Sequence, residues 1–510
     1  MKTSRREFAK LSALGLAANA VGAVPLLSKA SLASSAPASS ASASSASASP
    51  IAGAISVWVT NDKSRYAAGN AIAWKPASGG PSANEITLHP ETKFQPILGF
   101  GAALTDAACY TFNQLSPESR AQLFHELFDP AEMGFSVCRT CIGASDYSTK
   151  LYSFDEGAPD PDLTRFSIDH DRKYILPMLR EARKANPDLF LFSSPWSPPG
   201  WMKGNNSLLG GAMQRKYMSS YANYFVKFLQ GYAAEGVPVQ AVTVQNELDT
   251  EQDGRMPACA WPQEYEADFV RNMLGPTFEK NNVETKIWII DHNYNLWGRA
   301  LGELETPNVR KYTNAIAWHG YVGQVEWIDR VQEKYPDVEM YWTEGGPDYT
   351  DPHYLDDWSK WSATFTGILR HWCRSITSWN FALDEKGKPN IGPFPCGGLV
   401  SINSSTKEIA RCGQFWAFAH YSKTIRRGAR RFDSQGFNPQ GIDSHAVDSQ
   451  STDPQRRAND IQHVGFENPD GQRVLVVTNS GAATTAALRL GGMQADVPLD
   501  ANSVTTLAWR

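Results

Sequence analysis

The chain of 510 residues has 42% hydrophobic residues and a formal net charge of −5 at pH 7. This length suffices for a large domain with its own hydrophobic core and a second, smaller one. The acidic balance argues against a nucleic-acid partner, because proteins that bind nucleic acids present a basic face to the phosphates.

The first 50 residues resemble an export signal followed by a tether. Residues 4–10 form a twin-arginine pattern, an apolar run follows from Leu11 to Leu27, and small residues suit cleavage near position 33. The run is too short and too interrupted to predict a membrane span. The alternatives to an export signal are an uncleaved anchor and a basic start that arises by chance. We expect residues 1–33 to direct twin-arginine export to the periplasm or beyond. Residues 34–50 hold only Ser, Ala and Pro and predict a flexible tether. Residues 1–33 hold five Lys/Arg and one Asp/Glu, so without them the net charge is −9.

Residues 95–424 alternate between strand-like and helix-like segments. The segments between the strands, such as Pro117–Phe128 and Gln214–Ala234, have the apolar spacing of amphipathic helices, and the one after the fifth strand is the least regular. Eight repeats predict a (β/α)8 TIM barrel of the α/β class, with a doubly wound open sheet as the alternative. The predicted strands are Ile97–Leu104, Phe135–Ile142, Leu189–Ser194, Ala241–Gln245, Lys286–Ile290, Ala315–Trp318, Met340–Thr343 and Ile376–Phe381.

Residues 425–510 change to short β-runs separated by turn residues, which predicts an antiparallel side β-sandwich. Weak alternation within residues 51–94 predicts that the N-terminal end supplies one or two strands to the same sandwich. Both chain ends would therefore pack together beside the barrel. The predicted C-terminal strands are Ile461–Glu467, Gln472–Thr478, Thr484–Leu490 and Ser503–Trp509.

Two glutamates, Glu247 and Glu344, each end a short apolar β-run. Carboxylates in this position lie at the rim of a barrel, where barrel enzymes place their chemistry. A pair held about 5–5.5 Å apart serves a retaining glycosidase as nucleophile and as acid and then base. Asn246, directly before Glu247, can donate to a sugar 2-hydroxyl.

Other strand ends carry polar and aromatic side chains that suit a sugar site. Arg139 lies among apolar neighbours and needs a carboxylate partner, which we expect to be the nucleophile, and a structural ion pair is the alternative. Asp146 can accept hydrogen bonds from sugar hydroxyls. Trp196 stands in a proline-stiffened loop with Trp201, and we expect one of them to form a sugar platform. Asp106, after the first strand, is interpreted as a helix cap.

The later strands add His319 and Tyr321, which could orient the carboxylates, and Trp379, a candidate for the floor of the site. Asp291 and His292 could suggest a metal, but no further ligands stand at suitable spacing. The seven cysteines include a single C-x-x-C with no metal-binding neighbours. We therefore expect neither a metal nor another cofactor.

Seven stretches, in order, resemble glycoside hydrolase family 30, which includes glucosylceramidases and β-1,6-glucanases. The resemblance implies a (β/α)8 barrel with a side β-sandwich from both chain ends, Glu247 as acid/base and Glu344 as nucleophile. It also implies that Arg139, Asp146, Trp196, Asn246, His319, Tyr321 and Trp379 bind substrate or support the site. The chain departs from the lysosomal members at 391–398, where those members place a further sugar-contacting Asn, and in the insert Asp249–Pro262 on the leaving-group side. The matching stretches are 99–106, Arg139 with 146–148, 194–201, 245–247, 318–321, 342–344 and 379–383.

These observations predict an exported retaining β-glycosidase, glucosylceramidase-like, that acts on a β-linked glucoside, glycolipid or glycan without obligate membrane insertion. A β-1,6-glucanase or a β-xylosidase/β-fucosidase of the same family is the alternative. Two other classes stay open: a non-catalytic carbohydrate-binding protein, and a metal-dependent hydrolase centred on Asp291, His292 and His319.

Overall fold

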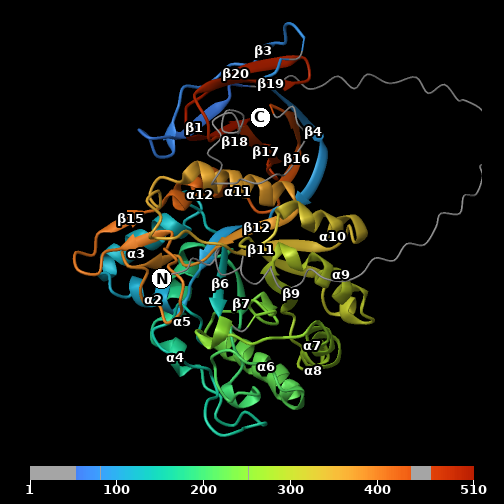
Figure 1. The fold of residues 1–510 in the computed structure, drawn as a ribbon. Coiled ribbons are helices and arrows are strands. Elements are labelled where there is room, and N and C mark those ends of the chain that lie inside the picture. Colours follow the sequence, from blue (N-terminus) through green and yellow to red (C-terminus); the bar gives the residue numbers. More distant parts are fainter. Residues whose placement is uncertain (1–52, 81, 251, 438–460) are drawn as a thin grey trace, which may run out of the picture.

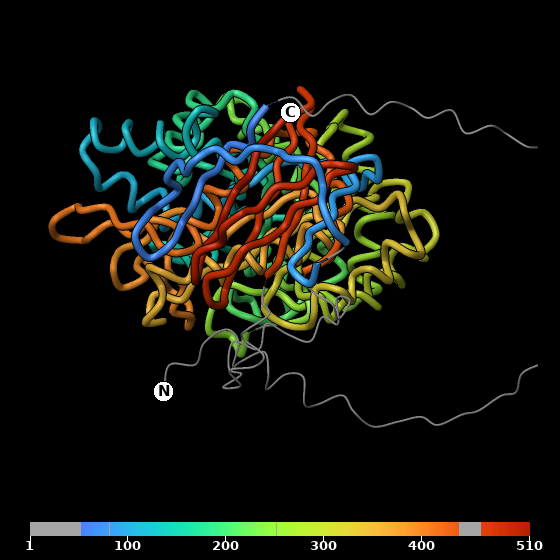
Figure 2. Tube along the Cα trace, turned by 90° about the horizontal axis from the view of Figure 1, so that it is seen from above, coloured from blue at the N-terminus to red at the C-terminus, as the bar shows by residue number. Residues whose placement is uncertain are grey.

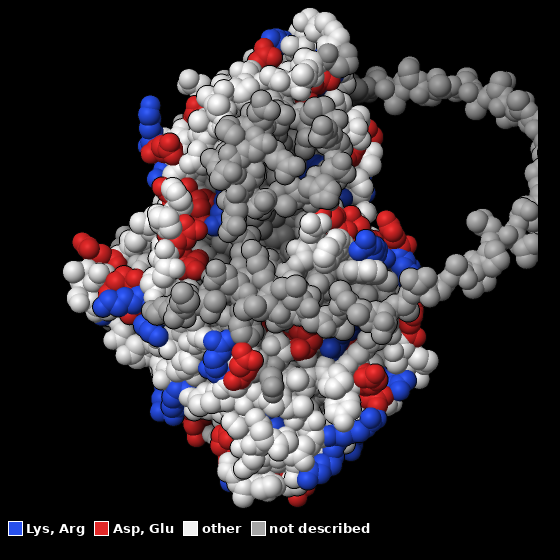
Figure 3. Space-filling model, viewed as in Figure 1, with Lys and Arg blue, Asp and Glu red and all other residues white. Residues whose placement is uncertain are grey.

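The computed structural model describes residues 53–80, 82–250, 252–437 and 461–510. The predicted export signal and tether lie outside the described residues. Within the described residues, the helices are all too short or too polar to cross a membrane. The seven cysteines are all buried free thiols. On the face drawn in Figure 3, basic and acidic side chains are interspersed over the coloured surface, so the described part of this face has no wholly basic stripe.

Eight parallel strands close into a barrel, which confirms the (β/α)8 prediction and rules out the open sheet. Going round the barrel, the order is β10-β11-β12-β5-β6-β7-β8-β9, so the first and last strands, β5 and β12, pair with each other. Because every pair is parallel, all eight strands end at one rim of the barrel (Figure 1). The strands are β5 (Gly99–Ala103), β6 (Val137–Cys141), β7 (Phe190–Ser194), β8 (Ala241–Thr243), β9 (Lys286–Asn293), β10 (Ala315–His319), β11 (Glu339–Glu344) and β12 (Cys373–Ser378).

Helices surround the barrel, and α3 (Pro117–Phe128) shows why the sequence forms them. Ser116 caps it by accepting from the Ser119 N–H (3.1 Å), proline occupies the first turn, and the apolar stripe Leu123, Phe124, Leu127 and Phe128 is buried. The irregular segment after the fifth strand does contain a helix, α9. The others are α2 (Asp106–Phe112), α4 (Asp169–Arg172), α5 (Ile175–Ala185), α6 (Met218–Ala234), α7 (Gln263–Phe269), α8 (Gly275–Lys280), α9 (Trp297–Glu305), α10 (Asp329–Lys334), α11 (Trp358–Arg370) and α12 (Gly413–Ser422).

The interpretation of Asp106 as a helix cap is wrong. Thr105 caps α2, since its hydroxyl accepts from the Ala108 N–H (3.0 Å), and Asp106 is the first residue of the helix. The Asp106 carboxylate accepts instead from the Thr149 N–H and hydroxyl (2.9 and 3.0 Å) and pairs with Tyr174. It therefore fixes the segment after β6.

The two chain ends share one ten-stranded sheet, which confirms a side sandwich built from both ends. The N-terminal part supplies four strands instead of the one or two predicted, and β4 runs parallel to β19, so the sheet is not wholly antiparallel. Figure 2 shows blue and red segments side by side. In order, the strands are β2 (Ala67–Ala68), β1 (Ser56–Thr60), β21 (Ser503–Trp509), β18 (Arg473–Asn479), β17 (Ile461–Glu467), β16 (Arg430–Gly436), β4 (Glu85–Pro96), β19 (Thr484–Leu490), β20 (Met493–Leu499) and β3 (Lys75–Pro76).

The sandwich has its own hydrophobic core and docks on α11 and α12, which lie between it and the barrel in Figure 1. Buried polar contacts fix this interface: His420 contacts the hydroxyls of Thr60 (2.8 Å) and Thr506 (2.9 Å), and the hydroxyls of Ser362 and Thr478 lie 2.6 Å apart. Burial lowers the pKa of His420 to about 3, so this histidine is neutral. A small sheet of β13 (Ala382–Leu383), β14 (Val400–Ile402) and β15 (Ile409–Arg411) follows the barrel.

Candidate active site

Glu247 and Glu344 meet at the rim where the barrel strands end. Glu344 is the last residue of β11, and Glu247 follows β8 by four residues. One imidazole reaches both carboxylates: His319 Nδ1 lies 3.3 Å from Glu247 Oε1, and His319 Nε2 lies 4.0 Å from Glu344 Oε2. The two carboxylates therefore face one site, and both are buried.

Arg139 of β6 lies under this site and is fully buried. One guanidinium nitrogen lies 2.5 Å from Glu344 Oε2, and the other donates to Asn246 Oδ1 and Asp291 Oδ2, both at 2.8 Å. Burial acts to lower the pKa of Arg139, but Asp291 and Glu344 outweigh it and raise the pKa, so the guanidinium remains charged. Arg139 thus ties the Glu344 carboxylate to the residue that precedes Glu247.

Asp291, at the carboxyl end of β9, is the buried anion that organises the site. Burial acts to raise its pKa, but Arg139 and His319 outweigh this and hold the pKa far below its ordinary value. The sequence pointed to Asp291 only as a possible metal ligand. Its carboxylate accepts from five side chains of other strands: Arg139 (2.8 Å), Ser194 (2.8 Å), Thr243 (2.7 Å), His319 (3.0 Å) and Thr343 (2.7 Å).

His319 is held as an imidazolium. Burial acts to lower its pKa, but the charge of Glu344 and the hydrogen bonds to Asp291 and Glu247 raise it to about 9. Both ring nitrogens therefore carry protons near neutral pH and donate to Glu247 Oε1 and Asp291 Oδ1. The imidazolium fixes the orientation of Glu247.

Two further side chains, Gln252 and Tyr321, contact the carboxylates. Gln252 Nε2 donates to Glu247 Oε2 (2.9 Å), and the Tyr321 hydroxyl donates to Glu344 Oε1 (3.1 Å). The backbone N–H of Tyr321 donates to Asn293 Oδ1 (2.9 Å), which holds the Tyr321 loop against the end of β9. Gln252 was not predicted as a site residue, because no pattern in the sequence of the insert indicates which of its side chains points toward Glu247.

Trp196 and Trp379 stack on one another beside Arg139. Their ring centroids lie 4.9 Å apart with an interplanar angle of 18°, and the Arg139 guanidinium carbon lies 4.6 Å from the Trp196 ring centroid. Trp201 has a structural position, with its indole N–H donating to the Asp155 carbonyl (2.9 Å) and its ring against Tyr217. Of the two loop tryptophans, Trp196 is therefore the one at the site.

Asp146 lies where the 391–398 segment meets the site. Its carbonyl accepts from the N–H groups of Ile391 (2.8 Å) and Gly392 (3.2 Å). The neighbouring Tyr147 hydroxyl donates to the Phe394 carbonyl (2.7 Å) and accepts from the Cys396 N–H (2.8 Å). A Cβ on Gly392 would lie 2.5 Å from the Asp146 Cβ, so only glycine allows this approach. The segment is thereby fastened to the second strand end.

Glu247, His292 and His319 could each offer one metal-ligand atom, and the three atoms lie within 4.8 Å of one another. The other ring nitrogen of His319 contacts Asp291, and His292 Nε2 pairs with Asp249. His292 Nδ1, however, lies 3.2 Å from Asn293 Nδ2, and a metal would require His319 to give up the proton that its raised pKa favours. We therefore describe these side chains as a hydrogen-bonded network around Glu247.

A (β/α)8 barrel with two carboxylates at the carboxyl-terminal rim, a buried arginine on one of them and stacked indoles beside it defines a glycoside hydrolase site. The chain belongs to glycosyl hydrolase family 30. The TIM-barrel domain of that family matches residues 97–425, and its β-sandwich domain matches residues 443–507.

The named relatives of the chain include endo-1,6-β-D-glucanases and glucosylceramidases. An endo-1,6-β-D-glucanase of Neurospora crassa is 31% identical over 400 residues, covering 74% of this chain and 82% of the relative. The lysosomal acid glucosylceramidase of Mus musculus is 26% identical over 452 residues, covering 83% of each chain. A solved endo-β-1,6-glucanase is 27% identical and superposes with a TM-score of 0.78 over 90% of this chain and 100% of the other.

Proposed function

We propose that this protein is a retaining β-1,6-glucanase. The observation that carries the chemistry is the unequal surroundings of two carboxylates that share one imidazole. Glu344 is paired with the buried Arg139 at 2.5 Å, which suits a nucleophile that must stay ionised. Glu247 contacts the imidazolium of His319 (3.3 Å) and the Gln252 amide (2.9 Å), two donors that hold its carboxylate in position to act as the base of the second step.

In the first step, a Glu344 oxygen bonds to the anomeric carbon while the bond to the leaving oxygen breaks. Glu247 gives its proton to that oxygen, so the leaving group departs as a neutral alcohol. In the second step, water attacks the anomeric carbon and gives a proton to Glu247, and the bond to Glu344 breaks. Two inversions restore the starting configuration. The Tyr321 hydroxyl, 3.1 Å from Glu344 Oε1, can remain hydrogen-bonded to that oxygen during both steps.

The choice of β-1,6-glucan over glucosylceramide is supported by the relatives. Endo-1,6-β-D-glucanases of Neurospora crassa, Trichoderma harzianum and Aspergillus fumigatus are 29–31% identical to the chain over 74–85% of it, whereas the mouse lysosomal glucosylceramidase and putative glucosylceramidases of Caenorhabditis elegans are 26–30% identical over 68–86% of it. The glucosylceramidase-like interpretation of the sequence therefore becomes the second candidate. It keeps the same two catalytic glutamates and differs only in the leaving group.

The test is a side-by-side measurement of kcat/KM on linear β-1,6-glucan, dispersed glucosylceramide and an aryl β-xyloside, with Glu344→Gln as the inactive control. We expect the glucan to be the best substrate. Preferred turnover of glucosylceramide would overturn the β-1,6-glucanase proposal in favour of the second candidate, and binding of glucan without turnover would favour a carbohydrate-binding protein.

We also propose that residues 1–33 direct export by the twin-arginine route, on the basis of the pattern at residues 4–10. Changing both Arg5 and Arg6 to Lys should retain the full-length protein in the cytoplasm of a host with that route. Unchanged export of this variant would contradict the proposal.

A further inference from the structure

The insert that follows Glu247 turns one side chain back toward the acid/base. Gln252 and Asp253 both have a backbone φ of +52°, and Gly254 has +66°. Non-glycine residues rarely adopt this left-handed conformation, and such residues gather at functional sites. The Thr250 hydroxyl accepts from the Gln252 N–H (3.1 Å) and supports the turn. As a result Gln252 is only 6% exposed, whereas the neighbouring Asp253 side chain is 69% exposed.

Only one of the two polar atoms of the Gln252 amide has a hydrogen-bond partner among the described residues. Its Nε2 donates to Glu247 Oε2 (2.9 Å), and because a carboxylate accepts hydrogen bonds, this contact fixes the amide with its oxygen on the other side. That oxygen, Oε1, is buried and has no hydrogen-bond partner among the described residues. Buried acceptors are nearly always satisfied, so an unsatisfied one beside a catalytic carboxylate points to a partner that arrives with the substrate.

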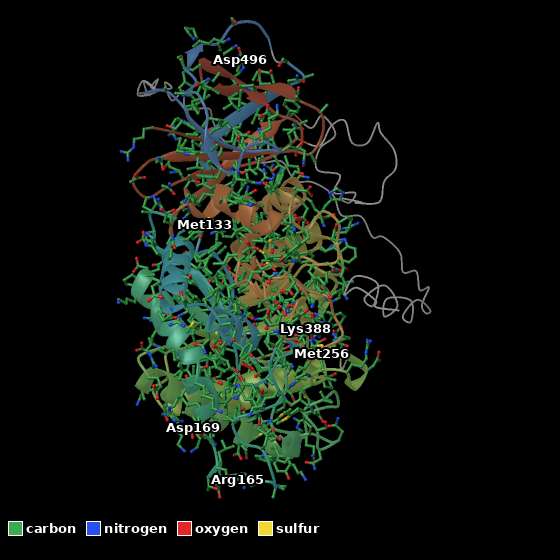
Figure 4. All side chains as sticks on the ribbon, turned by 90° about the vertical axis from the view of Figure 1, so that its left-hand side faces the viewer. Met133, Arg165, Asp169, Met256, Lys388 and Asp496 are labelled. Atoms are coloured by element: carbon green, nitrogen blue, oxygen red, sulfur yellow. The ribbon has the colours of Figure 1, made fainter. Side chains whose placement is uncertain are left out.

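The later part of the insert, residues 256–261, is attached to the barrel and supports the turn that contains Gln252. The N–H of Trp261 donates to the Leu248 carbonyl (2.7 Å), and the N–H of Ala260 donates to the Gly211 carbonyl (2.8 Å). Met256 belongs to the same buried cluster as Trp196 and Trp379, so the insert packs into the hydrophobic cluster that holds the indole pair. Figure 4 labels Met256 on the barrel half of the molecule.

We propose that Gln252 selects a sugar as the leaving group. Glu247 protonates the departing oxygen, so an acceptor beside Glu247 lies next to the group that departs. Gln252 Oε1 accepts a hydrogen bond from a hydroxyl of the departing sugar unit, while Nε2 holds Glu247 in position. A hydroxyl-rich leaving group satisfies this oxygen and an aliphatic one leaves it unpaired. This inference rests on the proposed function and deepens it, because it assigns the leaving-group preference to one residue.

The test is Gln252→Met, which keeps the length of the side chain and removes both polar atoms. Two substrates with the same reacting sugar are compared: a β-1,6-linked gluco-oligosaccharide and hexyl β-D-glucoside. Both leaving groups are alcohols that need the proton from Glu247, but only the first carries hydroxyls. We expect the ratio of kcat/KM for the oligosaccharide to that for the hexyl glucoside to fall about 10-fold or more.

Asp253→Asn is the matched control, because it changes the same turn at an exposed position outside the site, and its ratio should match that of the unaltered protein. An equal fall on both substrates would show that Gln252 only positions Glu247, and an unchanged ratio would show no role in selection. Either result overturns the inference. If the unaltered protein cleaves neither substrate, the proposed function falls, and the inference falls with it.

Discussion

Replacing Asp291 with Asn tests whether the buried negative charge of Asp291 stabilises the fold and keeps His319 protonated. The amide keeps one oxygen acceptor and gains an N–H group in place of the other. The Asp291 Oδ2 side faces Arg139, Ser194 and Thr243, and the Oδ1 side faces His319 and Thr343. Arg139 can only donate, so the amide oxygen has to stay on the Oδ2 side. The new N–H group then faces His319, which must lose its Nε2 proton to accept from it.

The expected loss of stability depends on which of the buried charged groups still have a partner in the Asp291→Asn variant. Arg139 keeps Glu344, so no guanidinium is left alone, but the attraction among the buried charges of Arg139, Asp291 and His319 is lost. Removing one partner of a buried ion pair costs about 3–5 kcal/mol, and here the retained hydrogen bonds place the loss near the lower limit, about 3 kcal/mol. The pKa of His319 should fall from about 9, because the hydrogen bond and the charge of Asp291 are lost while Glu344 and Glu247 still act to raise it.

Urea unfolding at pH 7 measures the stability, and NMR of ¹⁵N-labelled histidine follows the His319 ring. The control is Asp496→Asn, which removes an ion pair to Lys75 that is half exposed and lies in the sandwich, where Figure 4 labels Asp496. That control should cost less than 1 kcal/mol. If Asp291→Asn costs as little as the control, or if the pKa of His319 is the same as in the unaltered protein, the reasoning about the buried charges is refuted.

Three further predictions concern the catalytic groups. Glu247→Gln should keep the rate of the first step on aryl glucosides with very good leaving groups, whereas its rate on substrates with alcohol leaving groups should fall about 10²–10⁴-fold. Glu344→Gln should lose activity on both kinds of substrate. Near-normal activity of the Glu344 variant would show that the two roles are assigned wrongly. Because the folded protein raises the pKa of His319 from 6.5 to about 9, this residue stabilises the fold fully below pH 6.5 and loses that contribution as the pH rises through about 9. The unfolding free energy should therefore fall over this range by about 3 kcal/mol more than that of His319→Gln, and parallel curves would contradict the assignment. Dialysis against a chelator should leave glucoside hydrolysis unchanged, whereas a loss restored by zinc would favour the metal-dependent hydrolase built on Asp291, His292 and His319.

The barrel and the positions of its carboxylates could be predicted because their signals are local. Each strand is a short apolar run, and a polar residue at its end must lie at the common rim. The partnership of Arg139 with Glu344 also follows from a general rule, since a buried cation needs an anion. The local pattern thus indicates where the chemistry sits and one pair that forms there.

The roles of Asp291 and Gln252 could not be predicted in the same way. Asp291 gathers donors from five other strands, and only closure of the barrel brings them together. Gln252 depends on a left-handed turn inside an insert, and neither glutamine nor its neighbours require that turn. The strand β20 was missed because Pro498 breaks the usual strand composition, and the parallel pairing of β4 with β19 joins segments from opposite ends of the chain that carry no local signal of one another.

The central claim is that Glu344 bonds covalently to the sugar. The most direct measurement is mass spectrometry after incubation with a 2-deoxy-2-fluoro-β-glucosyl fluoride, which slows the release of the glycosyl group. The account predicts one added fluoroglucosyl group per chain, carried by the peptide that contains Glu344 and absent from Glu344→Gln. Attachment to another residue, or inactivation without any added mass, would contradict it.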